Sequence, residues 1–161
     1  DSISVVQGGA GTDLLSFASF TTALTLSLAS SDPANTGAGF FIIVGFENLR
    51  GGSNNDTLEG SDDDNVLDGR AGNDVLTGAG GVDTFVYADG FDDDTITDFS
   101  IAEDDTVDLR GLTGVVSFSD LVANHLSQGG SGAEITSGNG EVLVLTGIDM
   151  NDLTSAQFIF A

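Results

Sequence analysis

Apolar side chains recur every nine residues between Gly51 and Val86, within a stretch that is otherwise rich in glycine and aspartate. Each nonad starts with glycine, has Asp or Asn at its sixth position and an apolar residue at its eighth. The three columns are Gly51, Gly60, Gly69 and Gly78; Asp56, Asn65, Asp74 and Asp83; and Leu58, Leu67, Leu76 and Phe85. A separate copy spans Gly8 to Ser16. This fixed period indicates a repeat architecture.

Nine residues suit a turn of six followed by a strand of three. Glycine at the first position permits positive φ or a close approach of the backbone. The fourth position is filled by residue types that tolerate the left-handed region, namely Asn54, Asp63, Gly72 and Gly81. The seventh position has residues of high β-propensity, namely Thr57, Val66, Val75 and Thr84.

Two nonads then form one coil of an all-β fold, a right-handed parallel β-roll with strands on two faces and turns along two edges. Neighbouring strands are about 4.8 Å apart, so we expect Asp56 to stack near Asp74, and Asn65 near Asp83. Two carboxylates ~5 Å apart repel by about 3 kcal/mol at an effective dielectric near 20. The roll therefore requires a cation between its turns.

The flanking sequence predicts further strands. Alternating Leu24, Leu26 and Leu28 indicate a half-buried strand, and a hairpin is expected around Asn139-Gly140. Ser119 is expected to cap a short helix that reaches Leu126. We therefore expect a single module over 1–161, with N-terminal strands and one isolated repeat in 1–50, four repeats in 51–86, and a capping segment in 87–161.

The composition of the chain disfavours several classes of binding partner. The chain has 26 acidic residues against three basic ones, a net charge of −23, which disfavours nucleic acid and anionic membranes. Its apolar stretch at 38–46 is too short for a membrane helix of roughly 18 or more residues. Cysteine is absent, which excludes thiolate metal sites. Calcium accepts six to eight oxygen ligands, including backbone carbonyls, and so suits these turns. We expect a monomer.

The nonads resemble the GGxGxD repeats of RTX (hemolysin-type) calcium-binding proteins. The resemblance implies several calcium ions between stacked turns, held by backbone carbonyls and sixth-position side chains. One site is expected between 51–56 and 69–74, and another between 60–65 and 78–83. The implied ligands in these turns are Gly52, Asn54, Asp56, Ser61, Asp63, Asn65, Gly69, Ala71, Asn73, Asp74, Gly78, Gly80, Val82 and Asp83.

One repeat departs from the family pattern, and further acidic residues are candidate ligands outside the four repeats. Asn65 replaces the family aspartate, and the neighbouring acids at 62–64 are expected to compensate. Glu47 and Asp92 continue the register outward as further candidate ligands. Asp94 and Asp98 either bind an additional ion or belong to a solvated acidic loop, and Asp32, before Pro33, is expected in a solvated loop.

The resemblance extends beyond the repeats. Residues 83–112 resemble the segment that closes the roll in serralysin-type proteases and in the R-modules of mannuronan epimerases. The last ten residues resemble the uncleaved signal of proteins exported by type I secretion. The resemblance implies a secreted, extracellular bacterial protein. Because the chain starts at Asp1, we expect an excised fragment of a longer protein that ends near Ala161.

Two functions remain open after this reading. The first is a structural module that folds on extracellular calcium and supports export through a type I secretion apparatus. The second is a calcium-dependent module that binds polysaccharide or a cell surface. Three arginines make an anionic polysaccharide the less favoured partner. A glycan-binding assay with and without chelator distinguishes the two functions.

Catalysis is not expected of this segment. His125 is the sole histidine, and no G-x-S-x-G elbow is present to expose a serine nucleophile. The glycines follow the nonad period rather than a phosphate loop or dinucleotide fingerprint. An ordinary surface histidine is favoured over a Ser-His-Asp triad.

Overall fold

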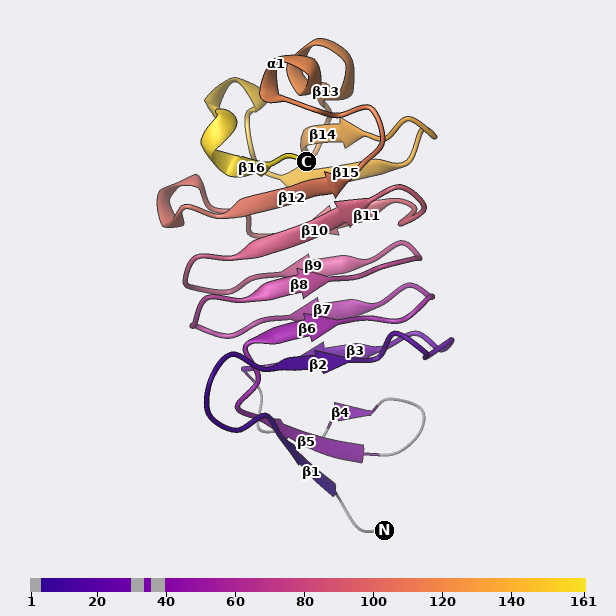
Figure 1. The fold of residues 1–161 in the computed structure, drawn as a ribbon, viewed down its shortest axis with the longest axis vertical. Coiled ribbons are helices and arrows are strands. Elements are labelled where there is room, and N and C mark those ends of the chain that lie inside the picture. The colour runs from indigo at the N-terminus through magenta and orange to yellow at the C-terminus, as the bar shows by residue number, and fades with distance from the viewer. Residues whose placement is uncertain (1–3, 30–33, 36–39) are drawn as a thin grey trace.

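Two parallel β-sheets stacked into a tall roll make up most of the molecule (Figure 1). The computed structural model describes residues 4–29, 34–35 and 40–161. The chain climbs from one end of the roll to the other and alternates between the sheets, so each coil has one strand on each face. The expectation for Asp32 falls outside the described residues.

One sheet has six strands in the order β16-β12-β10-β8-β6-β2, and every neighbouring pair is parallel. Alternate nonads contribute its central strands. The strands are β2 (Leu14–Ser16), β6 (Asn48–Arg50), β8 (Val66–Asp68), β10 (Thr84–Ala88), β12 (Thr106–Gly111) and β16 (Phe158–Ile159).

The other sheet has seven strands in the order β13-β14-β15-β11-β9-β7-β3, parallel from β3 to β15 and antiparallel beyond it. Its strands are β3 (Thr25–Ser27), β7 (Thr57–Glu59), β9 (Val75–Thr77), β11 (Asp94–Ile96), β13 (Leu126–Gln128), β14 (Gly132–Thr136) and β15 (Val142–Thr146). These two sheets confirm the expected all-β parallel roll.

The core consists of two columns of apolar side chains that face each other between the sheets. Strand pairing aligns the eighth positions of alternate nonads, as in Leu58 opposite Leu76 and Leu67 opposite Phe85. Their side chains are at most 1% exposed. Successive side chains of a strand point to opposite faces, so the central residue of each three-residue strand in the repeats faces inward and the period of nine supplies one apolar anchor for each strand.

The isolated repeat at 8–16 is part of the same roll. Its strand β2 pairs with β6, which places Leu15 opposite Leu49. The first strand of the chain and two strands between β3 and β6 form a separate small sheet in the order β1-β5-β4 (Figure 1). Its strands are β1 (Ser4–Gln7), β4 (Ala34–Asn35) and β5 (Phe40–Val44).

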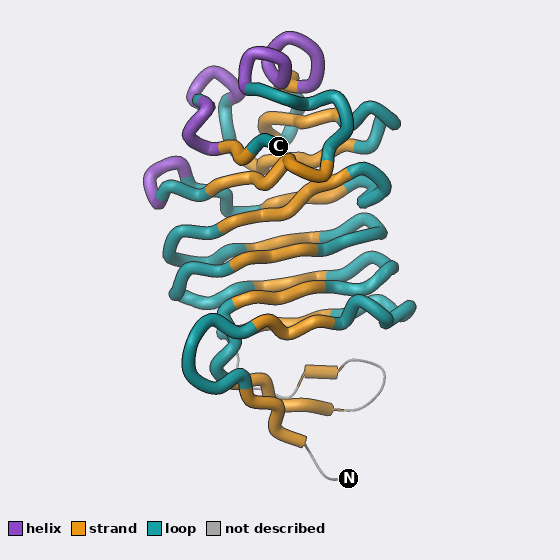
Figure 2. Tube along the Cα trace, in the orientation of Figure 1, coloured by secondary structure: helices purple, strands orange, loops and turns teal. Residues whose placement is uncertain are grey.

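Antiparallel strands and short helices cover the C-terminal end (Figure 2). The predicted hairpin is confirmed as β14–β15. The predicted helix differs from expectation: α1 (Phe118–Asp120) is capped by Ser117, and a π-helical turn follows at Leu121–His125. Leu126 already belongs to β13, because its antiparallel pairing with Ile135 ends the helix.

The inward column predicts a strong dependence on single leucines. We expect Leu67→Ala to lower the free energy of unfolding by about 2–5 kcal/mol, because it leaves a cavity between the sheets. Its neighbour Val66 faces outward and is 38% exposed, so Val66→Ala should change it by about 0.5 kcal/mol. Urea unfolding at saturating calcium measures both values, and similar losses would contradict the assigned faces.

Candidate metal centre

The turns that precede the strands stack along the two edges of the roll. On what we call the first edge lie the turns 51–56, 69–74 and 89–94, which lead into β7, β9 and β11. On the second edge lie the turns 60–65, 78–83 and 100–105, which lead into β8, β10 and β12. Turns separated by one coil therefore face each other, as the repeat predicts.

A ladder of carboxylates joins the turns of the first edge. The Asp56 carboxylate accepts the Leu24 N–H at 2.8 Å, Asp74 accepts the Asp56 N–H at 2.7 Å, and Asp94 accepts the Asp74 N–H at 2.9 Å. These three aspartates are each 1% exposed. Each sixth-position side chain therefore binds the backbone of the coil before it.

The second edge has an equivalent ladder. The Asn65 N–H donates to Asp83 at 2.9 Å, and the Asp83 N–H donates to Asp105 at 2.9 Å. Asn65, Asp83 and Asp105 are all nearly buried. The repeat period does not predict Asp105 as a ligand, because inserted residues move it out of the period of nine. The Asp-x-x-Asp pattern at 105–108 was the available signal.

In some turns, but not in others, a backbone N–H of the same turn donates to the sixth-position side chain. In 51–56, the Gly52 N–H donates to the second oxygen of Asp56 at 2.7 Å. In 60–65, the Ser61 N–H donates to Asn65 Oδ1 at 2.6 Å. These two turns therefore use the second-position N–H to satisfy their own sixth residue.

The turns 69–74 and 89–94 leave the corresponding oxygen free. Both have positive φ at the second and fourth positions: 77° at Arg70 and 114° at Gly72, and 82° at Gly90 and 67° at Asp92. Asp74 Oδ2 and Asp94 Oδ2 are buried and have no hydrogen-bond partner. A buried carboxylate oxygen without a donor is costly, and a cation offsets that cost.

Electrostatics separate these two aspartates from ordinary surface acids. Burial, together with the charges of Asp56, Asp68 and Asp92, raises the pKa of Asp74 to about 7. Burial likewise raises the pKa of Asp94 to about 8, with Asp74, Asp92 and Asp93 adding to the effect. On the second edge, burial raises the pKa of Asp83 to about 6. Neighbouring acids therefore oppose each other's ionisation.

The structure brings together some predicted ligands and separates others. Asp92 lies beside Asp74 and Asp94, and its carboxylate accepts the Gly72 N–H at 3.2 Å. Asp98 lies on the second edge, where its two oxygens accept the N–H groups of Gly78 and Ala79, each at 2.9 Å. Asp94 and Asp98 therefore do not share a site, because β11 separates them.

The remaining predicted ligands lie in the four turns of the repeats, as expected. Calcium binding by their carbonyl groups stays a prediction. They are Gly52, Asn54, Ser61, Asp63, Gly69, Ala71, Asn73, Gly78, Gly80 and Val82. The glycine at a first position is required by packing: a Cβ on Gly69 would overlap the Asp74 carboxylate.

The acids at 62–64 border an open hollow on the second edge. Thr12 of the isolated repeat and Glu47 line its other side. Glu47 accepts the Asp13 N–H at 2.8 Å, and Asp13 Oδ2 is buried without a partner. Residues of the isolated repeat and of the four consecutive repeats therefore line the same hollow.

The donor set of the turns fits calcium better than other biological metals. Within 4–29, 34–35 and 40–161, no three acidic, histidine or cysteine side chains converge on one point. An ion at Asp74 and Asp94 therefore needs backbone carbonyls to complete its coordination. Calcium accepts such mixed oxygen sets with irregular geometry, whereas magnesium prefers to retain its waters.

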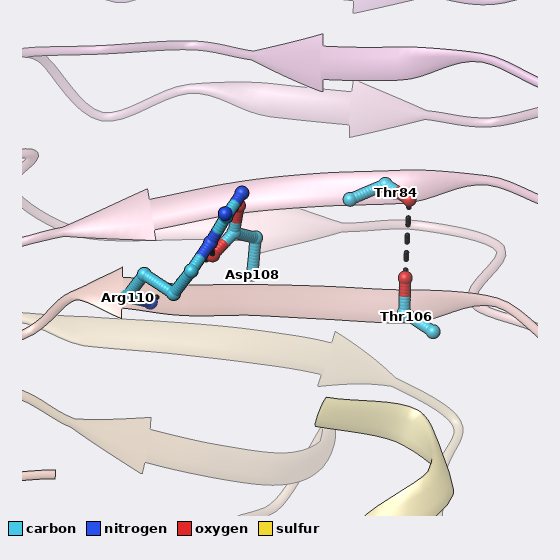
Figure 3. Close-up of polar contacts among 4 residues, drawn as sticks. All are labelled: Thr84, Thr106, Asp108 and Arg110. Carbon is cyan, nitrogen blue, oxygen red and sulfur yellow. Dashed lines mark hydrogen bonds and ion pairs between the residues drawn. The ribbon is translucent and has the colours of Figure 1, made fainter. Parts of the chain in front are cut away.

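Polar side chains on the outer face of the six-stranded sheet form hydrogen bonds and ion pairs with one another (Figure 3). The hydroxyls of Thr84 and Thr106 are hydrogen-bonded at 3.1 Å, and Arg110 forms an ion pair with Asp108 at 2.6 Å. Arg50 pairs with Asp68 at 2.6 Å in the same way. Two of the three arginine side chains are therefore engaged within the chain.

His125 has a structural environment. Its Nδ1 is 2.8 Å from the carbonyl oxygen of Thr136, across the contact between the π-helical turn and β14. This contact fixes the ring against the hairpin.

Residues 50–85 match the family described as RTX calcium-binding nonapeptide repeat, in four copies. This segment consists of RTX repeats. No curated protein sequence matches the chain. Among solved structures, the extracellular lipase LipA from Serratia marcescens is similar, with a TM-score of 0.57 and 14% sequence identity. The alignment covers 99% of this chain and 34% of the lipase, and at this identity it supports the fold alone.

The matched family is described as calcium-binding, and the match covers the repeat segment alone. In the part of the chain that the structure describes, no helix has the length and apolar character needed to cross a membrane.

The buried acids predict how stability depends on pH without calcium. Raised pKa values mean that the folded state binds protons more tightly than the unfolded state, so stability should fall as pH rises from about 4 to about 8. Each such group contributes on the order of 1.4 kcal/mol per pH unit in its window. We expect the β-structure that circular dichroism detects in calcium-free buffer to be greater at pH 5 than at pH 8, and Asp74→Asn to reduce that difference. A β-structure content that rises with pH would refute this.

Proposed function

We propose that this chain is a module that folds on calcium outside the cell and supports the export and stability of a larger secreted protein. The observation that carries the proposal is the pair of buried, unpartnered oxygens on Asp74 and Asp94 in stacked turns. Their neighbours are other carboxylates, so the folded chain without a cation retains strong repulsion. A bound calcium ion supplies the positive charge that offsets it.

The residues of the chain prepare this site in a defined way. The ladder hydrogen bond from the Asp74 N–H to Asp94 Oδ1 fixes the spacing of the two turns. Asp92 holds the Gly72 N–H, which leaves the carbonyl groups of the turn 69–74 as candidate ligands. Because such a geometry exists only when the coils are stacked, binding free energy contributes directly to folding.

Secretion is the second part of the proposal. The chain aligns with about a third of an extracellular lipase, and RTX repeats are found in secreted bacterial proteins. Without cysteine, no disulfide can lock the chain before export. With a net charge of −23, the chain should remain unfolded in a calcium-poor cytosol, which suits passage through a narrow channel.

Polysaccharide or surface binding remains the alternative prediction, and no specific feature favours it. The arginines that an anionic glycan would need are largely paired with Asp68 and Asp108. Comparing alginate pull-down with and without chelator would test this alternative.

Calcium should convert the chain from a weakly structured to a folded state. We expect circular dichroism to show little β-structure in chelator and a cooperative gain at ~10⁻⁴–10⁻³ M calcium, the range typical of extracellular modules. Asp74→Asn keeps the ladder acceptor but removes charge, so it should raise the calcium midpoint about tenfold, equivalent to about 1.4 kcal/mol.

Two matched variants control this experiment. Asp56→Asn should raise the midpoint less, because the Gly52 N–H already occupies the second oxygen of Asp56. Asp152→Asn should leave it unchanged, because Asp152 is an exposed residue of the C-terminal end. A protein equally folded in chelator, or equal midpoints for all three variants, would sink the calcium proposal.

Export can be tested with a passenger fused in front of this chain. We expect secretion in one step from cells that carry a compatible type I transporter, and a loss when Phe158 to Ala161 are deleted. That deletion also removes β16, since Phe158 is buried, so Leu67→Ala serves as a control that weakens the fold but keeps the terminus. Retention of the intact fusion inside such cells would refute the secretion role and leave calcium binding untouched.

A further inference from the structure

In two turns of the repeats, the second-position N–H satisfies the sixth-position side chain. Gly52 and Ser61 donate to the sixth residue of their own turn, at 2.7 Å and 2.6 Å. In the turn 69–74, Asp74 Oδ2 is unpartnered and φ is positive at Arg70, so the conformation of the turn can itself keep the oxygen free. An acceptor elsewhere in the chain is a second way to hold this N–H away from the carboxylate. In the turn 89–94 the second residue is Gly90, and its N–H has such an acceptor.

The acceptor for Gly90 is Glu141, which lies in the C-terminal hairpin. The Gly90 N–H is 3.1 Å from each carboxylate oxygen of Glu141. Asp94 Oδ2 in the same turn is buried and has no partner. Asp56, whose turn lacks an outside acceptor for Gly52, has both oxygens satisfied.

We propose that Glu141 is a positioning residue for calcium: by accepting the Gly90 N–H, it keeps Asp94 Oδ2 free to bind the ion. The inference rests on the proposed calcium-binding function and concerns the site that includes Asp74 and Asp94. Glu141 acts through Gly90 and is not itself a ligand.

The hairpin holds Glu141 in place for this role. Ser137, which is 5% exposed, donates its hydroxyl to Glu141 Oε2 at 2.9 Å. Strand β15 pairs with β11 so that Leu143 lies opposite Asp94. The Val142 N–H also donates to Asp93 at 2.9 Å. The docking of the hairpin is therefore coupled to the turn that presents Asp94.

The surroundings of Tyr87 provide a local reporter of this site. Tyr87 is the only tyrosine, and the chain has no tryptophan. Its hydroxyl donates to the carbonyl of Asp92 at 3.1 Å. The ring therefore lies against the turn 89–94 and can sensitise a terbium ion bound there.

The test measures tyrosine-sensitised terbium luminescence, with calcium competition, in the full chain. Glu141→Gln and Glu141→Met are similar in size and both uncharged, but only Gln retains an oxygen that accepts the Gly90 N–H. We expect the Met variant to bind terbium and calcium roughly tenfold more weakly, because Asp94 regains the N–H as a donor to its free oxygen. The Gln variant should stay within about threefold of the unmodified chain.

Glu59→Gln provides the control for loss of one negative charge, since Glu59 is exposed at the end of β7. It should not change terbium affinity. Urea unfolding at saturating calcium reports the structural effect of each variant separately from affinity.

The outcomes separate the possible roles of Glu141. Equal weakening in the Gln and Met variants would mean that its charge, not its acceptor oxygen, matters, and would overturn the inference. So would a Met variant that binds like Glu59→Gln, or one that does not fold at saturating calcium, since Glu141 would then be purely structural. If the unmodified chain binds neither terbium nor calcium, the proposed function itself fails.

Discussion

The stacking of carboxylates at successive turns is the constraint on which this roll depends. Each buried aspartate holds the coil before it through a short hydrogen bond to a backbone N–H. The same stacking places like charges side by side in a poorly hydrated edge, which disfavours the folded state. The ladder thus needs the carboxylates for its geometry and a positive charge for its stability.

The ladder continues beyond the four regular nonads into longer coils. The ladder steps within the four nonads span 18 residues, whereas the next steps span 20 on the first edge and 22 on the second. The added residues lengthen β10 and form the 3₁₀ helix at Ile101–Glu103. Thr84, Phe85 and Val86 still pair in register with both neighbouring strands, and the register between β10 and β12 shifts only beyond Val86, where Ala88 lies opposite Gly111.

The period of nine was sufficient to predict the coil, its inward leucines and the stacking of Asp56 on Asp74. It was not sufficient beyond residue 86, where inserted residues hide the continuation of the ladder to Asp94 and Asp105. It also could not predict which carboxylate oxygens remain free. That depends on the backbone conformation of each turn and on the acceptor of its second-position N–H. For Gly90 this acceptor is 51 residues away in the sequence.

Protons and calcium compete for the same oxygens in such a roll. At pH 7, a pKa of about 8 leaves the Asp94 carboxyl mostly protonated in the cation-free fold. Protonation lowers the repulsion between stacked turns, but it also removes the charge that attracts calcium. The cation-free fold therefore weakens as pH rises, while calcium affinity strengthens over the same range. The dependence of folding on calcium is consequently greatest on the alkaline side of neutrality, where the buried carboxylates are ionised and have no other means of neutralisation.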